Sequence, residues 1–81
     1  MRATVPPRRT IEKAPEAIVF GTRVRKLRLS RGWTQERLAE EAELNSVQVS
    51  HIERGANEPK LTTIIRLARA LGVKAGKLLD D

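Results

Sequence analysis

The chain has 81 residues, 40% of them hydrophobic, with one tryptophan, one phenylalanine and no tyrosine, which points to one small aliphatic domain of helical class. The absence of cysteine excludes disulfides and thiolate chemistry, and a single histidine is too few for a multi-histidine metal site. A net charge of +6 favours a polyanionic partner such as nucleic acid.

The N-terminal segment differs in composition from the rest of the chain. Pro6 and Pro7 oppose a helix, while Arg8 and Arg9 add positive charge without the apolar stretch of a secretory signal. No run of the ~20 apolar residues needed to span a bilayer is present, so we expect a cytoplasmic protein without a membrane partner. Residues 1–14 are interpreted as a basic arm, either a flexible tail or an extension lying along a DNA groove. Residues 15–81 form the folded domain.

A first helix is predicted from Pro15, a favourable first-turn residue, to about Arg31, with Gly32 ending it in the left-handed conformation. The apolar residues at helical spacing face the core: Phe20, Val24 and Leu27. Five basic residues and no acid lie between positions 23 and 31, whereas residues 36–43 are mostly acidic. This segregation predicts a dipolar surface with one side facing a polyanion.

Two short helices joined by a turn of three or four residues follow. Thr34 caps the first of them, and because Arg37 occupies the third helical position the cap is simple rather than a capping box. The inner face of this helix holds Leu38, Ala39 and Ala42. The next helix begins with Asn45 or Ser46 as its cap and ends at Gly55. Its inward residues are Val49 and Ile52.

A fourth helix is predicted over Leu61–Leu71, closed by Gly72. Its apolar stripe consists of Leu61, Ile64, Leu67, Ala68 and Leu71. A short fifth helix covers about Ala75 to Leu79, where Gly76 costs about 1 kcal/mol relative to alanine. This last helix is therefore expected to be weak unless it docks. Together these elements predict an all-α, compact five-helix domain.

Several stretches resemble the lambda-repressor-like, Cro-type (XRE) helix-turn-helix family, which includes phage repressors, restriction-modification controller proteins and antitoxins. The resemblance covers roughly residues 18–79 and implies a DNA-binding transcription factor with a lambda-repressor-like fold. The stretches that carry it are residues 27–28, 32–39 (Gly-Trp-Thr-Gln-Glu-Arg-Leu-Ala), 49–55 (Val-Ser-His-Ile-Glu-Arg-Gly) and 65–73, with Pro59.

The resemblance implies that the third helix enters the major groove and contacts bases through Ser46, Val47 and His51, with Gln48 as a further candidate. Short side chains in its first turn suit this, because they let the backbone approach base edges. The alternative is an exposed polar face without function. Since no Arg or Lys precedes Arg54 in this helix, we expect modest direct readout, supplemented by DNA shape and phosphate contacts.

Phosphate contacts are expected at helix N-termini, where free N–H groups favour anions. The resemblance implies that Gln35, at the start of the second helix, holds a phosphate. The loop into the fourth helix supplies further donors, although such charges individually are often only solvated surface. The candidate phosphate-binding residues are Gln35, Asn45, Arg54, Asn57, Lys60 and Thr62.

Arg28 and Glu53 fall on inward-facing stripes, where an unpaired charge costs several kcal/mol. The resemblance implies that they pair across the first and third helices. We interpret this as a structural ion pair that fixes the angle of the recognition helix.

One such module covers about half of a DNA site, and dimers on pseudo-palindromic sites are the rule for this motif. The apolar residues left after the core is assigned predict a homodimer interface at the C-terminal end: Val73, Leu78 and Leu79. Glu36 and Glu40 share one face of the second helix. That face is either ordinary solvated surface or, by resemblance to some phage repressors, a contact with RNA polymerase.

No nucleophile–base pair, metal cluster or Gly-rich phosphate loop is present, so we expect no enzyme activity and no cofactor. The sequence predicts a transcriptional regulator, either a repressor or a controller protein. It would bind double-stranded DNA sequence-specifically as a dimer, through the major groove of a pseudo-palindromic operator. The alternative is an antitoxin or adaptor, a protein-interaction module on the same fold.

Overall fold

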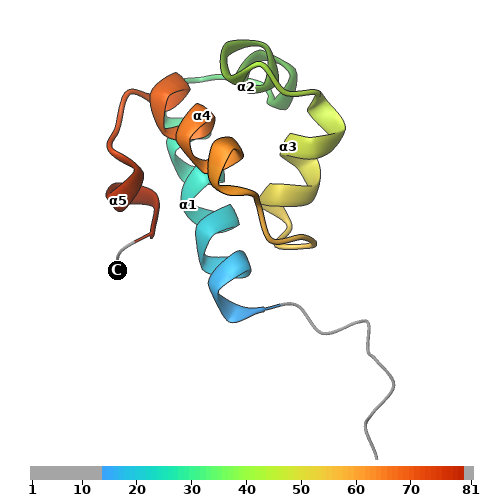
Figure 1. Ribbon diagram of the computed structural model, residues 1–81. Helices are drawn as coiled ribbons and strands as arrows, with labels where there is room; N and C mark the ends of the chain where they lie inside the picture. The colour runs from blue at the N-terminus through green and yellow to red at the C-terminus, as the bar shows by residue number, and fades with distance from the viewer. Residues whose placement is uncertain (1–13, 80–81) are drawn as a thin grey trace, which may run out of the picture.

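The computed structural model describes residues 14–79, and these form five α-helices without a strand (Figure 1), which confirms the predicted fold class. The helices are α1 (Pro15–Ser30), α2 (Gln35–Ala42), α3 (Ser46–Glu53), α4 (Leu61–Leu71) and α5 (Ala75–Leu79). Of the predicted arm only Ala14 falls within the described residues, and it precedes the first turn of α1. None of the five helices is long and apolar enough to cross a membrane.

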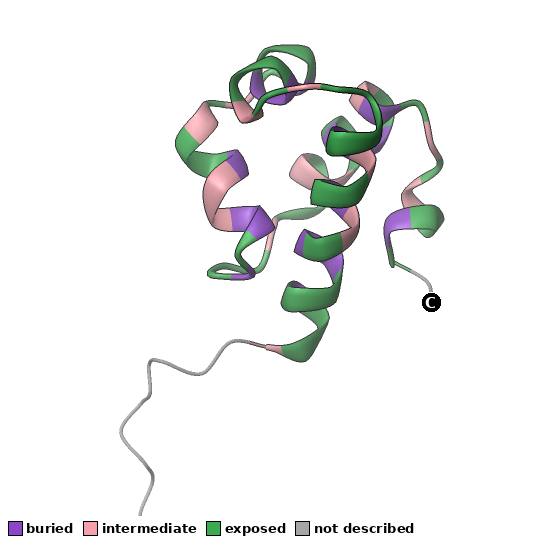
Figure 2. Cartoon of the chain, turned by 180° about the vertical axis from the view of Figure 1, so that it is seen from behind, coloured by how far each residue is buried: buried purple, intermediate pink, exposed green. Residues whose placement is uncertain are grey.

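The longest helix, α1, lies between α3 and α5. It contacts α3, α4 and α5, while α2 packs on α3 and α4. The views in Figures 1 and 2 agree that α3 and α5 lie on opposite sides of α1. The recognition helix expected from the sequence therefore lies on one side of the molecule, and the C-terminal helix on the other.

Every helix contributes to a single hydrophobic core, whose purple positions face inward in Figure 2. The largest fully buried side chains are Val24, Leu38, Val49, Leu67, Leu71 and Leu78. Burying a side chain of this kind stabilises the fold by roughly 1.5–3 kcal/mol. Because α3 contributes Val49 to the same core, the orientation of its outer face is determined by the packing of the whole domain.

The turn between α2 and α3 uses an unexpected residue. Glu43 adopts the left-handed conformation with φ of 61°, which costs a non-glycine residue about 1–2 kcal/mol. The N–H of Leu44 donates to the carbonyl oxygen of Ala39 at 2.8 Å and closes the turn.

At the start of α2, the side-chain oxygen of Thr34 accepts a hydrogen bond from the N–H of Arg37 at 3.0 Å, so the simple cap predicted for α2 is confirmed.

Two apolar assignments made from the sequence are wrong. Leu78, assigned to a dimer interface, is fully buried in the core of its own chain, so a second chain cannot contact it. It is the residue that docks α5 on the domain. Leu61, assigned to the core-facing stripe of α4, is 69% exposed, because the buried side of that helix is centred on Leu67 and Leu71.

The loop from α1 to α2 is held by the single tryptophan. The guanidinium carbons of Arg31 and Arg37 lie 5.3 and 5.1 Å from the centre of the Trp33 ring, within the range of cation–π contacts. Arg31 also donates to the carbonyl oxygen of Leu71 at the C-terminus of α4. Trp33 is therefore a natural fluorescence reporter for the folded state.

Candidate nucleic-acid interface

Helix α3 has one buried and one outward face. Val49, Ile52 and Glu53 are buried, whereas Val47 is 61% exposed. Of the other base-contact candidates of the third helix, Ser46 and His51 are half-buried and Gln48 is exposed. All four candidates therefore avoid the core side of the helix.

Ser50 belongs to the same outward face and was not among the sequence candidates. It is half-buried and follows Ser46 by four residues and Val47 by three, which puts the three side chains next to one another on a helix. The helical spacing alone could have identified it. The accessible face of α3 consists of Ser46, Val47, Gln48, Ser50 and His51.

The start of α3 is held by a capping box, which the sequence analysis did not assign there. The side-chain oxygen of Asn45 accepts from the N–H of Gln48 at 2.8 Å, and the side-chain oxygen of Gln48 accepts from the N–H of Asn45 at 3.1 Å. Asn45 was a candidate for phosphate binding and Gln48 for base contact. Both side-chain oxygens are engaged, which leaves the NH₂ groups as the available donors.

A shallow pocket brings several candidates together. Gln48 and His51 from α3 line it together with Asn57 and Lys60 from the following loop, and Thr63 lies at its α4 side. Thr62, the hydroxyl named from the sequence, is exposed and does not line this pocket. Two base-contact and two phosphate-binding candidates are therefore close neighbours.

The N-terminus of α4 adjoins this pocket. Its N-cap residue, Lys60, makes no side-chain cap hydrogen bond, so the first-turn N–H groups are not satisfied by that side chain. Arg54 is exposed at the C-cap of α3, and the acidic Glu58 lines the pocket beside Lys60. First-turn N–H groups with an adjacent cation suit an anion such as a phosphate.

Arg28 and Glu53 meet in the interior, as the resemblance implied. The Nε of Arg28 donates to Oε2 of Glu53 at 2.6 Å and its Nη2 to Oε1 at 3.0 Å, with side chains only 9% and 2% exposed. Nη1 donates to the carbonyl oxygen of Trp33 at 2.7 Å. This bidentate pair joins α1, the loop before α2 and the end of α3. The hydrogen bond that Arg28 donates to Glu53 raises the pKa of Arg28 above its ordinary value, against the lowering effect of burial.

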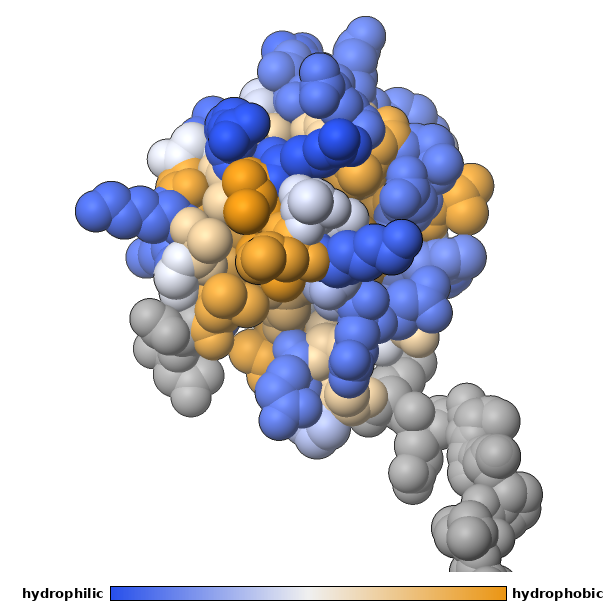
Figure 3. Space-filling model, in the orientation of Figure 1, coloured by the Kyte–Doolittle hydropathy of each residue, from blue (hydrophilic) through white to orange (hydrophobic). Residues whose placement is uncertain are grey.

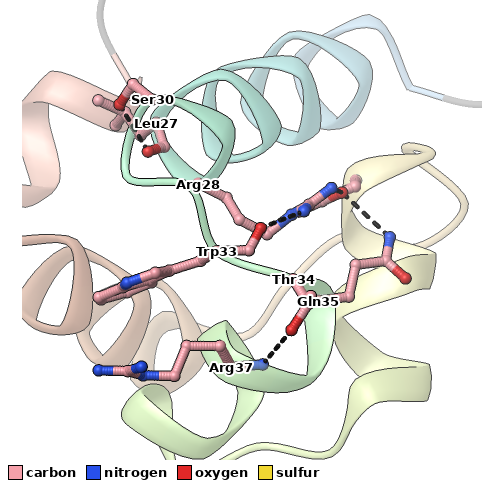
Figure 4. A network of polar contacts seen from close by, with 8 residues as sticks. Leu27, Arg28, Ser30, Trp33, Thr34, Gln35 and Arg37 are labelled. Atoms are coloured by element: carbon pink, nitrogen blue, oxygen red, sulfur yellow. Dashed lines mark hydrogen bonds and ion pairs between the residues drawn. The ribbon is translucent and has the colours of Figure 1, made fainter.

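Gln35 completes this network (Figure 4). Its Nε2 donates to Oε1 of Glu53 at 3.1 Å, so α2 is joined to the same carboxylate as α1. The side chain that the sequence assigned to a phosphate therefore also positions Glu53. Because the hydroxyl of Thr34 accepts from the N–H of Arg37, the N–H groups of Gln35 and Glu36 are the ones that this turn offers to an anion.

Helix α1 approaches α3 closely at Gly21. A Cβ atom added there would lie 2.0 Å from the carbonyl oxygen of Ile52 and 3.0 Å from the backbone of Glu53. Gly55, which ends α3 with φ of +69°, similarly lies against the backbone of Ile18. Helix α3 is held in place by backbone contacts that only glycine permits.

Much of the positive charge lies elsewhere. The basic segment of α1 was expected to face a polyanion, yet Arg23 and Lys26 line a hollow against α5, on the side of α1 away from α3. The candidate interface itself holds Arg54 and Lys60. Within residues 14–79, no group of three His, Cys, Asp or Glu side chains could hold a metal ion.

Comparison with known proteins agrees with this geometry. The model of a family described as Helix-turn-helix matches residues 24–78, about two thirds of the chain. The control protein C.BamHI of Bacillus amyloliquefaciens is 42% identical over 64 residues, which cover 78% of this chain and 79% of that protein.

Two solved structures extend the comparison. The restriction-modification controller protein C.AhdI from Aeromonas hydrophila superposes with a TM-score of 0.77 at 35% identity, covering 80% of this chain and 98% of that one. The P22 c2 repressor, solved in complex with synthetic operator 9T, gives a TM-score of 0.73 at 27% identity, covering 76% of this chain and 94% of that one.

Proposed function

The chain belongs to the helix-turn-helix (XRE-type) family of DNA-binding transcriptional regulators, which is not an enzyme family, and we propose that it binds a pseudo-palindromic operator as a dimer. In this proposal each α3 enters a major groove. The accessible face of α3 supports it: Val47 suits a thymine methyl, and His51 and the serine hydroxyls suit base-edge hydrogen bonds.

Phosphate contacts on both sides of α3 complete the proposed interface. The N-terminus of α2 at Gln35 supplies one anion site, and the N-terminus of α4 with Asn57 and Lys60 supplies the other. Thr62 adds an exposed hydroxyl in the first turn of α4. Such contacts fix the register of a protein on DNA, so that a small set of base contacts is sufficient for recognition.

His51 provides the test of sequence readout. We expect His51→Ala to reduce discrimination at one base pair of each half-site by about 1–3 kcal/mol while leaving the other positions unchanged. The measurement is selection of binding sites from random duplexes, followed by titration of single-base variants. Thr22→Ala is the control, because Thr22 lies exposed on α1 and its hydroxyl bonds to the carbonyl of Ile18. Identical preferences of His51→Ala and the parent protein at every position would refute base contact by His51.

The proposed dimer uses an apolar patch over α4 and α5, where Figure 3 shows hydrophobic side chains gathered on one face. With Leu78 in the core, the exposed residues that support this patch are Leu61, Ile65 and Leu79, and Val73 is half-buried. The proposed dimer interface thus remains at the C-terminal end, as expected from the sequence, and now also includes residues of α4.

Charge placed in the patch should prevent the dimer. We expect Leu61→Glu with Ile65→Glu to weaken self-association at least about tenfold, since one buried leucine contributes roughly 1.5–3 kcal/mol. Sedimentation and light scattering at tens of micromolar measure this. Leu29→Glu on α1 is the control, because Leu29 is 53% exposed and lies outside the patch. A parent protein that is monomeric under these conditions argues against the dimer.

The acidic face of α2 supports a second partner. Glu36 and Glu40 are exposed on that helix, and we propose that they contact RNA polymerase when the chain is bound to DNA. Transcription in vitro with Glu36→Lys and Glu40→Lys should lose activation while operator binding is retained. Glu16→Lys on α1 serves as the control for charge. Unaltered activation by the α2 variant would eliminate this contact.

An adaptor or antitoxin with the same fold is the competing function. The salt dependence of binding separates the two functions. When a protein binds DNA through phosphates, the logarithm of the binding constant falls linearly with the logarithm of the salt concentration, with a slope of about −0.9 for each phosphate neutralised. Failure to select any sequence from a random duplex pool would favour the adaptor.

A further inference from the structure

A hollow open to solvent lies between α1 and α5, and it plays no part in the proposed DNA interface. Leu27 of α1 and Val73, in the connection to α5, form its apolar floor. Four basic side chains surround this floor: Arg23, Lys26, Lys74 and Lys77. Among residues 14–79, none of those that line it is acidic.

Three of the four positive charges at this hollow are lysines. The side chains of Lys26, Lys74 and Lys77 form no hydrogen bond or ion pair with another residue of the described part of the chain. Arg23 donates to the carbonyl oxygen of Leu78 at 3.3 Å, which holds α5 against α1 and so maintains the hollow. Like charges gathered on one concave surface repel one another and attract an anionic partner.

The apolar floor narrows the kind of anion. A phosphodiester backbone could accept hydrogen bonds from the basic side chains, but it would gain little from Leu27 and Val73. A protein segment can offer both carboxylates and an aliphatic side chain, and apolar anchors surrounded by charged groups are typical of interface centres. We propose that this hollow binds an acidic segment of a partner protein, with one apolar side chain on Leu27 and Val73 and carboxylates against the surrounding lysines.

The location gives this site a separate role. Because α5 and α3 lie on opposite sides of α1 (Figures 1 and 2), a segment bound in the hollow leaves the accessible face of α3 open. The partner therefore does not compete with DNA for α3, although Val73 also belongs to the proposed dimer patch. The site does not depend on the proposed operator binding.

The probe is a short capped peptide with a central leucine flanked by glutamates, titrated into the ¹⁵N-labelled full chain. We expect the amide signals of Leu27, Val73 and Gly76 to shift and those of Val47 and His51 to stay. Replacing the leucine of the peptide with serine should weaken binding about tenfold, because the floor then loses its apolar contact.

Charge reversal locates the anion contact. Lys26→Glu with Lys77→Glu should weaken peptide binding at least about tenfold, whereas Arg25→Glu with Arg69→Glu, which changes the net charge equally at exposed sites outside the hollow, should weaken it less than about threefold. Circular dichroism verifies that both variants fold.

Four outcomes would overturn the inference. These are no binding of the peptide, equal losses in the two charge variants, equal affinity for the serine peptide, or shifts at α3 in place of the hollow. A short DNA duplex that shifts the hollow amides when the peptide does not would make this a second nucleic-acid surface. Failure of operator selection would leave the peptide result unchanged, so the two proposals fail independently.

Discussion

Glu53→Gln is expected to lower the free energy of unfolding by about 3–5 kcal/mol and to weaken DNA binding in parallel. The substitution keeps the shape of the side chain but leaves the buried guanidinium of Arg28 without its counter-charge. A small domain has only about 5–15 kcal/mol of stability, so much of it would be lost. Urea unfolding followed by Trp33 fluorescence gives the first quantity, and operator titration gives the second.

Two variants make this result specific. Arg28→Met alone should be as damaging, because Glu53 is then buried without its partner, whereas Arg28→Met with Glu53→Met should recover a large part of the loss. Glu41→Gln is the matched control, since it breaks the exposed pair with Arg37 and should cost no more than about 0.5 kcal/mol. Normal stability with lost binding in Arg28→Met would instead indicate that Arg28 contacts DNA directly.

Gly21→Ala is expected to destabilise the domain by about 3 kcal/mol or more, although alanine is the better helix former by about 1 kcal/mol. The added methyl would lie 2.0 Å from the carbonyl oxygen of Ile52, so α3 must move away from α1. Because the displaced element is the recognition helix, operator affinity should fall even under conditions where the variant is folded. Thermal unfolding and operator titration at low temperature measure the two effects.

Gly32→Ala separates crowding from backbone strain. Gly32 has φ of +71° with nothing within 4 Å of an added Cβ, so that variant should lose only about 1–2 kcal/mol. It also lies in the loop before α2, away from the α1–α3 contact. A stability of Gly21→Ala equal to or above that of the parent protein would show that α1 and α3 can separate without loss.

Local signals were sufficient to predict the helices. Thr34 at the start of α2 and the glycines at 32, 55 and 72 mark helix ends through hydrogen bonds and backbone conformations that lie within a few residues of chain. Helical spacing likewise predicted that Val24, Leu38 and Val49 face inward. Interactions over three or four residues are encoded in the chain order itself.

Contacts between segments far apart in the sequence were harder to predict from the sequence. Leu78 was expected to be exposed, but the core formed by α1 and α4 buries it completely. Glu43 adopts the left-handed conformation although it is not glycine, because packing of α2 against α3 outweighs the local preference. Neither the burial of Leu78 nor the conformation of Glu43 follows from residue type, since each depends on which helices pack against that residue in the folded domain.

The same division applies to the candidate interface. Its candidates on α3 came from family resemblance and helical spacing, and the structure adds the half-buried Ser50 to them. The bond from Gln35 to Glu53 and the close approach at Gly21 were not foreseen, because they join segments 18 and more residues apart.

The sequence by itself determined which stretches are helical, which face of each is apolar and which helix resembles a recognition helix. The tertiary structure alone decided how α3 is held, which leucines remain exposed and on which side of α1 the positive charge lies. The physical reason is the distance along the chain over which each kind of interaction acts. Caps, turns and helical spacing act over a few residues, whereas close packing and buried ion pairs depend on elements that meet only after the chain has folded.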